Sequence, residues 1–407
     1  MGFFDKLFKK NEKSEEKAAK PKAEPKPAPK AEAPKAAPAQ PKASTGNPGP
    51  YDFIVPPVAS PNDGKIPKDA ILPAADLGPL LPGAPAGGKI KLAVYWCAAC
   101  GGCDVSLLDT HERLLTIGDM ADIVMWPIAE DGKEKDIEAM DDGEITVSII
   151  SGAVRNTENE HMAKLLRQKS KIVVAYGTCA AFGGSPALAN LVPGGAEEIL
   201  DYVYTKTPSS ASFQNEYHKD APQIPQEKTQ VPEGELTIPT LYDTVKTLDQ
   251  VIDVDYTVPG CPPLPESISQ LLKAVADFVY NGVPLPPKGT VVGTTTKTLC
   301  EECPRQKTGA RITELKEPFQ VDIDPNACLM EQGILCLGPA TMGGCGARCT
   351  RVGQPCRGCY GPSPDVQEQG ASIFTAVASL FPILDEDPTC GEDEIIKIGR
   401  ASCRERV

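Results

Sequence analysis

The chain has 407 residues, which is long enough for more than one domain, and it carries a formal net charge of −14 at pH 7. This acidity disfavours nonspecific binding to nucleic acid, because the phosphates repel it. No window of the sequence approaches the roughly 18 consecutive apolar residues that a membrane-spanning helix needs.

Fifteen cysteines would suit a disulfide-rich secreted protein, but other features argue against that class. Disulfide density belongs mostly to small domains, and this chain is large. The N-terminus shows no apolar signal-peptide core, and no twin-arginine signal is expected because the first arginine is Arg113. The sequence therefore predicts a cytoplasmic protein whose reduced cysteines bind metal.

The first 88 residues are not expected to form a folded domain. Residues 1–45 are rich in Lys, Ala and Pro, a composition that cannot bury a core, so we expect a disordered extension. Residues 46–88 are rich in Pro and Gly and lack periodicity, so we expect an extended arm.

Residues 89–285 are predicted to form an α/β domain. Short apolar runs alternate there with helical patterns, which indicates a parallel sheet covered on both faces. The expected strands are residues 90–96, 123–126, 145–151, 172–176 and 251–258. The expected helices are residues 105–117, 157–169, 196–204 and 264–280. After the helix expected at 196–204, polar and Pro-rich sequence up to about residue 235 predicts a surface insertion.

Residues 286–362 are expected to form a second, irregular domain. Eight cysteines lie between residues 300 and 359, where apolar periodicity is sparse. Such a segment is expected to fold around metal and not around a hydrophobic core. Residues 363–407 are expected to form a C-terminal tail with one helix, 371–381.

Twelve of the cysteines fall into three sets of four, and four thiolates are what a cubane iron–sulfur cluster needs. The first set is Cys100, Cys103, Cys179 and Cys261. The second set is Cys300, Cys303, Cys328 and Cys336. The third set is Cys345, Cys349, Cys356 and Cys359. Three such sets in one chain indicate a path for electrons.

The first set is predicted to meet at one edge of the sheet. Each of its three loops directly follows a predicted strand, and parallel strands present their carboxyl ends at the same edge. Gly101 and Gly102 between the first two cysteines let the backbone turn tightly around a bulky cluster. Cys97 also has ligand spacing to Cys100, but without glycines between them, so we assign it no ligand role.

Clusters are not the only chemistry that these residues could support. The pairs Cys300/Cys303 and Cys356/Cys359 could form a zinc ribbon, but four further cysteines lie between them. The histidines His111, His161 and His218 are not expected to be ligands. Asp104 and Asp109 near the first set could adjust its charge or pass protons, or could be ordinary helix-terminal charges.

The motifs resemble those of the small subunit of nickel–iron hydrogenases. Tyr95-Trp96 leading into Cys100-Gly-Gly-Cys103, then Gly-Thr-Cys179 and Pro-Gly-Cys261-Pro-Pro, are similar to that family's first-cluster motifs. The segment from Cys328 to Cys336-Leu-Gly-Pro-Ala-Thr and the segment Cys356-Arg-Gly-Cys359-Tyr-Gly-Pro are similar to its C-terminal cluster motifs. The similarity is greatest to the cytoplasmic methyl-viologen-reducing, deazaflavin-independent type.

The resemblance implies a flavodoxin-like domain followed by an iron–sulfur domain, with three 4Fe-4S clusters and no nickel in this chain. Exported relatives use a histidine where Cys300 stands, and here a fourth cysteine, Cys345 or Cys349, is available for the middle cluster. Electrons from H2 oxidation would come from a nickel–iron centre in a separate large subunit. A small iron–sulfur subunit and a heterodisulfide-reductase-like flavoprotein are the further partners implied.

A related electron-relay subunit of the quinone or NADH oxidoreductase type is the alternative, beside a zinc-stabilised scaffold. The respiratory relative has two adjacent cysteines in its first motif and no C-terminal cluster domain. This chain has Cys100-Gly-Gly-Cys103 and the additional cysteine-rich region, which favours the hydrogenase resemblance.

Overall fold

The computed structural model describes residues 88–111, 113–210, 224–364, 366 and 368–381. All of these belong to one compact unit, Ser60–Val407. The predicted disordered extension, nearly all of the predicted arm and most of the predicted tail lie outside the described residues.

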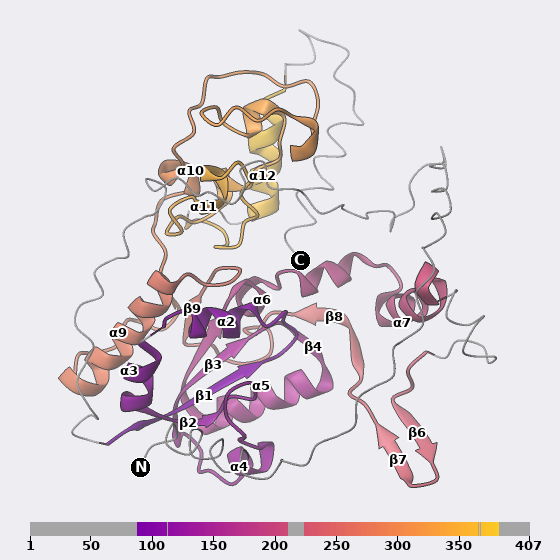
Figure 1. The fold of residues 1–407 in the computed structure, drawn as a ribbon, viewed down its shortest axis with the longest axis vertical. Helices are drawn as coiled ribbons and strands as arrows, with labels where there is room; N and C mark the ends of the chain where they lie inside the picture. Colours follow the sequence, from indigo (N-terminus) through magenta and orange to yellow (C-terminus); the bar gives the residue numbers. More distant parts are fainter. Residues whose placement is uncertain (1–87, 112, 211–223, 365, 367, 382–407) are drawn as a thin grey trace, which may run out of the picture. The chain divides into compact units, whose positions relative to one another are not determined.

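Six parallel strands form the main sheet, in the order β10-β9-β5-β3-β1-β2 (Figure 1). They are β1 (Ile90–Trp96), β2 (Ala121–Met125), β3 (Ile145–Ser151), β5 (Ser170–Tyr176), β9 (Tyr256–Val258) and β10 (Thr290–Val291). When the strands of this sheet alone are numbered in chain order, the five strands from β2 across to β9 have the order 2-1-3-4-5, which is that of flavodoxin-like sheets. The predicted fold class is confirmed, and β10, which follows residue 285, also belongs to this sheet.

Helices cover both faces of the sheet, as the apolar strands predicted. Side chains of β5 alternate between two cores: Val173 and Ala175 pack with α5 (Thr157–Lys169), whereas Val174 and Tyr176 pack on the other face. That second core also contains residues of α2 (Gly102–Leu108), α3 (Arg113–Met120) and α9 (Pro265–Asn281).

Three elements have the predicted bounds, β1, β3 and α5. The start of α5 is fixed by Asn156, whose side chain accepts a hydrogen bond of 2.8 Å from the backbone amide of Asn159. Arg167 and Lys169 lie in its last turn, where cations favour the helix dipole. These local signals are the kind that a sequence pattern reveals.

The single helix predicted for residues 105–117 is wrong, because the structure has α2 and α3 there. His111 between them has φ 53°, a left-handed conformation that ends a helix and that histidine tolerates better than most residues. The strand predicted for 251–258 is also too long. Val251 and Ile252 donate their amides to the carbonyl of Leu248, so this stretch turns before β9 begins.

The remaining elements are short. Beside the main sheet are α4 (Glu134–Glu138), β4 (Val154–Asn156), α6 (Thr178–Phe182), η2 (Pro186–Leu191), α7 (Gly195–Asp201), η3 (Tyr202–Lys206), β6 (Lys228–Val231), β7 (Gly234–Thr237) and β8 (Leu241–Lys246). The cysteine-rich part contains α10 (Leu299–Glu302), η4 (Pro318–Gln320), η5 (Met330–Gln332), η6 (Gly338–Ala340) and α11 (Arg348–Arg351), followed by α12 (Gln369–Ala378). Within the described ranges, none of the helices combines the length and apolarity needed to cross a bilayer.

Asp255, just before β9, is a buried charge that joins α5, β5 and the loop before β10. Its carboxylate accepts hydrogen bonds from Arg167 at 2.7 Å and from the Val173 amide at 2.8 Å, and it pairs with Lys288 at 2.5 Å. Burial by itself raises the pKa of Asp255, but the hydrogen bonds from Lys288, Arg167 and Val173 outweigh it and hold the pKa below its ordinary value.

Asp255→Asn is expected to lower the free energy of unfolding at pH 7 by about 1.5–3 kcal/mol, the worth of hydrogen bonds to a charged group. Since the folded-state pKa is depressed, this contribution is present above about pH 4 and is lost as the pH falls through the folded-state pKa. Anaerobic urea unfolding at pH 7 and at lower pH measures it. The exposed neighbour Asp253→Asn is the control, and equal stability of the two variants at pH 7 would contradict this role.

Candidate iron–sulfur centres

The first cysteine set lies at the carboxyl ends of three strands of the main sheet, β1, β5 and β9. Cys100 and Cys103 follow β1, Cys179 begins α6 after β5, and Cys261 follows β9. Burial, and after it the neighbouring thiols of Cys179, Cys261 and Cys100, raises the pKa of Cys103 to about 12. Parallel topology therefore brings all four together, as the sequence predicted.

A glycine makes room for this set. Gly177 has φ +86°, and a Cβ atom placed on it would lie 2.4 Å from the Sγ atom of Cys103. That distance is far inside van der Waals contact, so only glycine fits without moving the sulfur. The loop after β5 therefore approaches Cys103 as closely as the backbone allows.

A buried carboxylate lies beside the first set. Asp104 is 3% exposed; Oδ1 accepts a 3.1 Å hydrogen bond from the Trp126 indole, whereas Oδ2 has no partner among the described residues. Burial raises the pKa of Asp104, and the Trp126 hydrogen bond opposes that rise. Asp109 is exposed at the C-terminal end of α2.

Exposed apolar side chains border the first set. Trp96, Val105 and Leu108 are 39%, 54% and 41% exposed. The ring of Trp96 packs near Gly101: a Cβ atom placed on Gly101 would lie only 3.3 Å from a ring carbon of Trp96. Apolar groups gathered at an exposed site are typical of a surface that binds another protein.

The second set surrounds a small cavity. Cys300 and Cys303 lie in and after α10, Cys328 precedes η5 and Cys336 precedes η6. All four line the cavity, together with Arg305, Lys307 and Thr350. Burial raises the pKa of Cys300 to about 12; Lys307 opposes this rise, whereas Cys336, Cys328 and Cys303 add to it.

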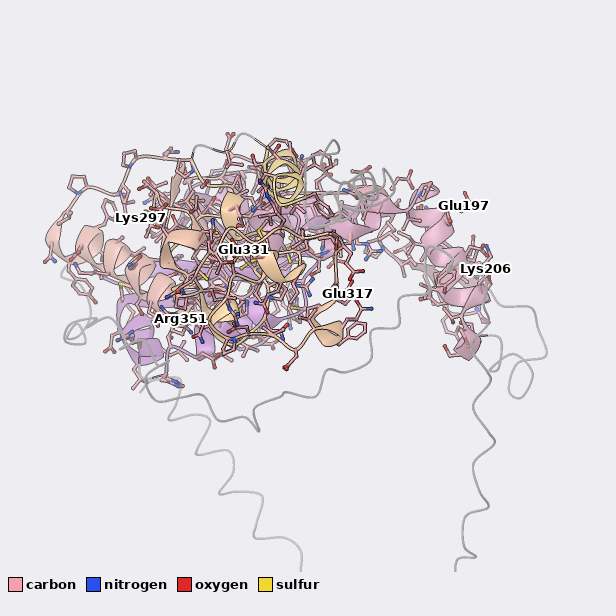
Figure 2. All side chains as sticks on the ribbon, turned by 90° about the horizontal axis from the view of Figure 1, so that it is seen from above. Glu197, Lys206, Lys297, Glu317, Glu331 and Arg351 are labelled. Carbon is pink, nitrogen blue, oxygen red and sulfur yellow. The ribbon has the colours of Figure 1, made fainter. Side chains whose placement is uncertain are left out.

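The third set is held by irregular backbone around α11. Cys345 precedes this short helix and Cys349 lies on it, and the helix ends at the exposed Arg351 (Figure 2). Burial, followed by the neighbouring thiols of Cys345 and Cys349, raises the pKa of Cys359 to about 12. Burial, and then Cys336, raises the pKa of Cys356.

Direct contacts place the third set between the other two. The Thr178 hydroxyl, next to Cys179, donates a 2.7 Å hydrogen bond to the carbonyl of Cys359, and the Cys261 backbone also bonds to Cys359. On the other side, the backbone amide of Cys356 donates to the Sγ atom of Cys336 at 3.2 Å. The three sets therefore follow one another in the order first, third, second.

The spacing of the sulfurs can be compared with the geometry of a single zinc ion. Zn–S bonds of about 2.3 Å put tetrahedral zinc ligands roughly 3.8 Å apart. The described residues contain one group of three or more His, Cys, Asp or Glu side chains whose ligand atoms all lie within 4.8 Å, and it contains no cysteine. The wider sets fit a cubane, which stands between its cysteines.

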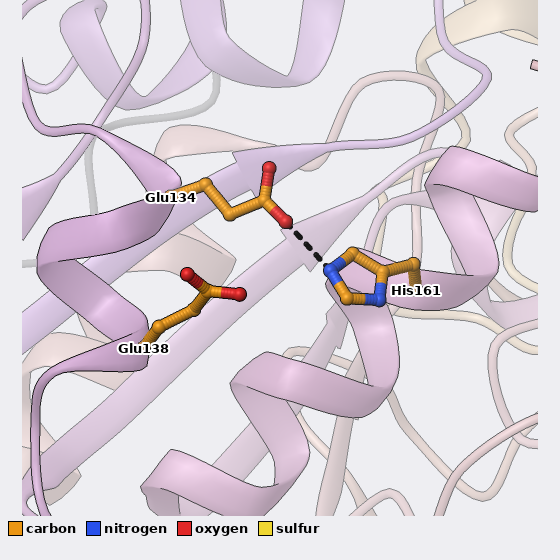
Figure 3. A group of neighbouring side chains, drawn as sticks. All are labelled: Glu134, Glu138 and His161. Carbon is orange, nitrogen blue, oxygen red and sulfur yellow. Dashed lines mark hydrogen bonds and ion pairs between the residues drawn. The ribbon is translucent and has the colours of Figure 1, made fainter.

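That compact group is Glu134 and Glu138 on α4 with His161 on α5 (Figure 3). All three are exposed, and His161 Nε2 lies 2.6 Å from a carboxylate oxygen of Glu134. This is the satisfied surface histidine that the sequence led us to expect. His111 lies in the turn after α2, and His218 lies outside the described residues.

The chemistry of the thiols also fits metal clusters. All thirteen described cysteines are free, and twelve of them gather in the three sets. Thiolates packed together repel one another, and cluster iron removes their protons and offsets this repulsion. Cys97 instead is buried with its Sγ atom 3.9 Å from the carbonyl of Asn159. Cys390 and Cys403 lie outside the described residues.

The sequence did not assign a role to some residues near these sites. Arg305 and Thr350 line the second cavity, and Thr178 joins the first and third sets. Thr178 precedes Cys179, and Arg305 follows Cys303 by two residues, so proximity to a ligand was the one available indication.

Comparisons with known proteins agree with the geometry. Residues 100–275 match the family described as NADH ubiquinone oxidoreductase, 20 Kd subunit. The iron-sulfur subunit of the F420-non-reducing hydrogenase of Archaeoglobus profundus is 41% identical over 76% of this chain and 92% of its own length. The like-named subunit of the F420-non-reducing hydrogenase of Methanothermobacter marburgensis is 36% identical, over 75% of this chain and 89% of its own length.

Among solved structures, a chain of an NAD+-reducing [NiFe]-hydrogenase in the H2-reduced state is 29% identical, with a TM-score of 0.39 over 49% of this chain and 97% of that chain. The sequence relatives decide the assignment, because they are 36–41% identical and cover about three quarters of this chain and about nine tenths of their own length. The chain is a hydrogenase subunit and belongs to the family of iron–sulfur subunits of F420-non-reducing hydrogenases.

Proposed function

We propose that this subunit conducts electrons from a nickel–iron centre in a separate large subunit to a redox partner, through three 4Fe-4S clusters held by the three cysteine sets. When bound, such a cluster accepts and releases one electron at a time. The cysteines supply the ligands, and the surrounding backbone amides and buried side chains set how readily each site is reduced.

The order of the three sets is the observation that supports this function most strongly. Thr178 and the Cys261 backbone bond to Cys359, and the Cys356 amide bonds to Cys336. Each set thus lies against the next through a direct hydrogen bond between ligand loops. A row of this kind is what a relay requires, whereas a structural metal protein has no need for it.

We assign the two ends of the row to two partners. The exposed apolar side chains Trp96, Val105 and Leu108 beside the first set suit the large subunit that delivers electrons. The second set, at the other end, faces the redox partner, for which a small iron–sulfur subunit and a heterodisulfide-reductase-like flavoprotein are the candidates. The free thiols fit a reducing compartment, so we assign the complex to the cytoplasm.

A relay subunit of a quinone reductase is the second candidate, favoured by the family match over residues 100–275. That match ends before the eight cysteines of the second and third sets. Hydrogen-dependent reduction of methyl viologen by the purified complex separates the two functions, because a quinone reductase would not reduce the dye with hydrogen.

The metal content of anaerobically purified protein tests the clusters. We expect about 12 irons and about 12 sulfides per chain, four of each for every set, and essentially no zinc. Low-temperature EPR after dithionite reduction should show interacting signals, since neighbouring sets are in contact. Zinc with little iron would reject the relay and leave a structural metal protein.

A further inference from the structure

A buried cation lies beside the second set. Arg305 is 9% exposed, and its guanidinium donates to the carbonyls of Thr350 at 2.7 Å, Asp324 at 2.7 Å and Ala327 at 3.0 Å. None of the ion pairs in the described part of the chain involves it. Carbonyl groups satisfy its hydrogen bonds but carry no net charge, so the positive charge is buried without a carboxylate to balance it.

The cavity lined by the second set is the place where a negative charge would balance the charge of Arg305. Arg305 and Lys307 line this cavity together with all four cysteines of the set. A cubane core with four thiolate ligands carries a net negative charge, and added electrons make it more negative. An adjacent cation that water cannot screen therefore favours the reduced form of such a site.

The other two sets have carboxylates as neighbours. Asp104 lies next to Cys103 and adds to the rise in the pKa of that thiol. Glu302 directly precedes Cys303 of the second set in the sequence. Its carboxylate, however, accepts hydrogen bonds from the amides of Gly344 and Gly346 and adds to the rise that burial causes in the pKa of Cys345, so it lies against the third set. Arg348, a cation on α11 beside the third set, is already paired with Glu266 at 2.6 Å.

We propose that Arg305, assisted by Lys307, makes the second set the most readily reduced of the three and so draws electrons toward the partner end of the relay. The inference rests on the proposed function. Each electron gained by the second set is lost by the third set, which is thereby oxidised. The electron then passes to a one-electron acceptor, an iron–sulfur or flavin group of the redox partner.

Redox titration followed by EPR, on the complex purified anaerobically with its partner subunits, tests the role of Arg305. The signal of the second set is identified by its loss or change in a Cys300→Ser variant. Arg305→Gln is expected to shift the midpoint potential of that signal to a more negative value and to leave the other two unshifted. Arg305→Lys keeps the charge and is expected to keep the midpoint close to that of the unaltered protein.

Arg351→Gln is the matched control, because Arg351 is an exposed cation near the third set whose side chain donates a hydrogen bond to the Gly346 carbonyl. Solvent screens its charge, so no midpoint should shift. Lys307→Gln is the second test, which applies if Arg305→Gln does not assemble. Lys307 is exposed, so folding should survive, but unlike Arg351 it lines the cavity of the second set and opposes the rise that burial causes in the pKa of Cys300, so a smaller negative shift is expected at the second set alone.

Two failures are distinguishable. Little iron in the unaltered protein would reject the proposed function itself. Three normal clusters with an unshifted second midpoint in Arg305→Gln, or in Lys307→Gln where the first variant does not assemble, would overturn the role of these cations alone. A shift of equal size in Arg305→Lys and Arg305→Gln would also overturn it, because the positive charge would then not be the cause.

Discussion

Cys179→Ser is expected to remove the first cluster and to abolish hydrogen-dependent electron transfer. Cys179 lies at the start of α6 between the loops that carry Cys103 and Cys261, and the thiols of Cys179 and Cys261 both add to the rise that burial causes in the pKa of Cys103. A serine hydroxyl is a much poorer ligand for iron than a thiolate. The relay would lose its entry site, because in our proposal the first set faces the large subunit.

The expected loss is about four of about 12 irons per chain. Hydrogen-dependent dye reduction should fall by more than the roughly 10–100-fold that removal of an outer-shell partner of a metal site costs. Iron analysis, EPR and dye reduction measure these effects on one preparation, and the signals of the second and third sets should persist.

Cys97→Ser is the matched control, since Cys97 lies three residues before Cys100, the same spacing as between Cys100 and Cys103. Its Sγ atom lies near the Asn159 carbonyl, a partner that a serine hydroxyl can keep. This variant should retain its iron and its activity. Full iron content in Cys179→Ser, or iron loss in Cys97→Ser, would show that the ligand assignment of the first set is wrong.

The sequence was informative where the signal is local. The buried strand β3 and the helix α5 have the predicted bounds because apolar runs, the Asn156 cap and the basic last turn all lie within one short segment. The convergence of Cys103, Cys179 and Cys261 also followed from sequence, because parallel strands end at one edge.

Nonlocal contacts were beyond the sequence pattern. The hydrogen bond from Thr178 to Cys359 joins residues 181 positions apart, and no periodicity encodes it. Arg305 looks like an ordinary surface arginine in the sequence, and only the folded loops around Thr350 and Asp324 bury it. The break between α2 and α3 depends on the left-handed backbone at His111, which the apolar pattern does not record.

Gly177→Ala is expected to have an effect on the first set comparable to that of Cys179→Ser, although it removes no ligand. Gly177 combines φ 86° with ψ 163°, a region that is essentially restricted to glycine and costs other residues about 1–3 kcal/mol. The new methyl group would also lie 2.4 Å from the Sγ atom of Cys103. Either the sulfur or the loop after β5 must move, and the four sulfurs can then no longer hold one cluster.

Gly282→Ala separates crowding from backbone strain. Gly282 ends α9 with φ +65°, but a Cβ atom there meets nothing within 4 Å. The Gly282→Ala variant should lose about 1–2 kcal/mol of stability, because alanine is strained in the left-handed backbone, and should keep its full iron content. Gly177→Ala should lose about four irons and the first EPR signal. Equal iron in both variants would mean that the approach of Gly177 to Cys103 does not matter for cluster binding, since the strain of a positive φ is present in each.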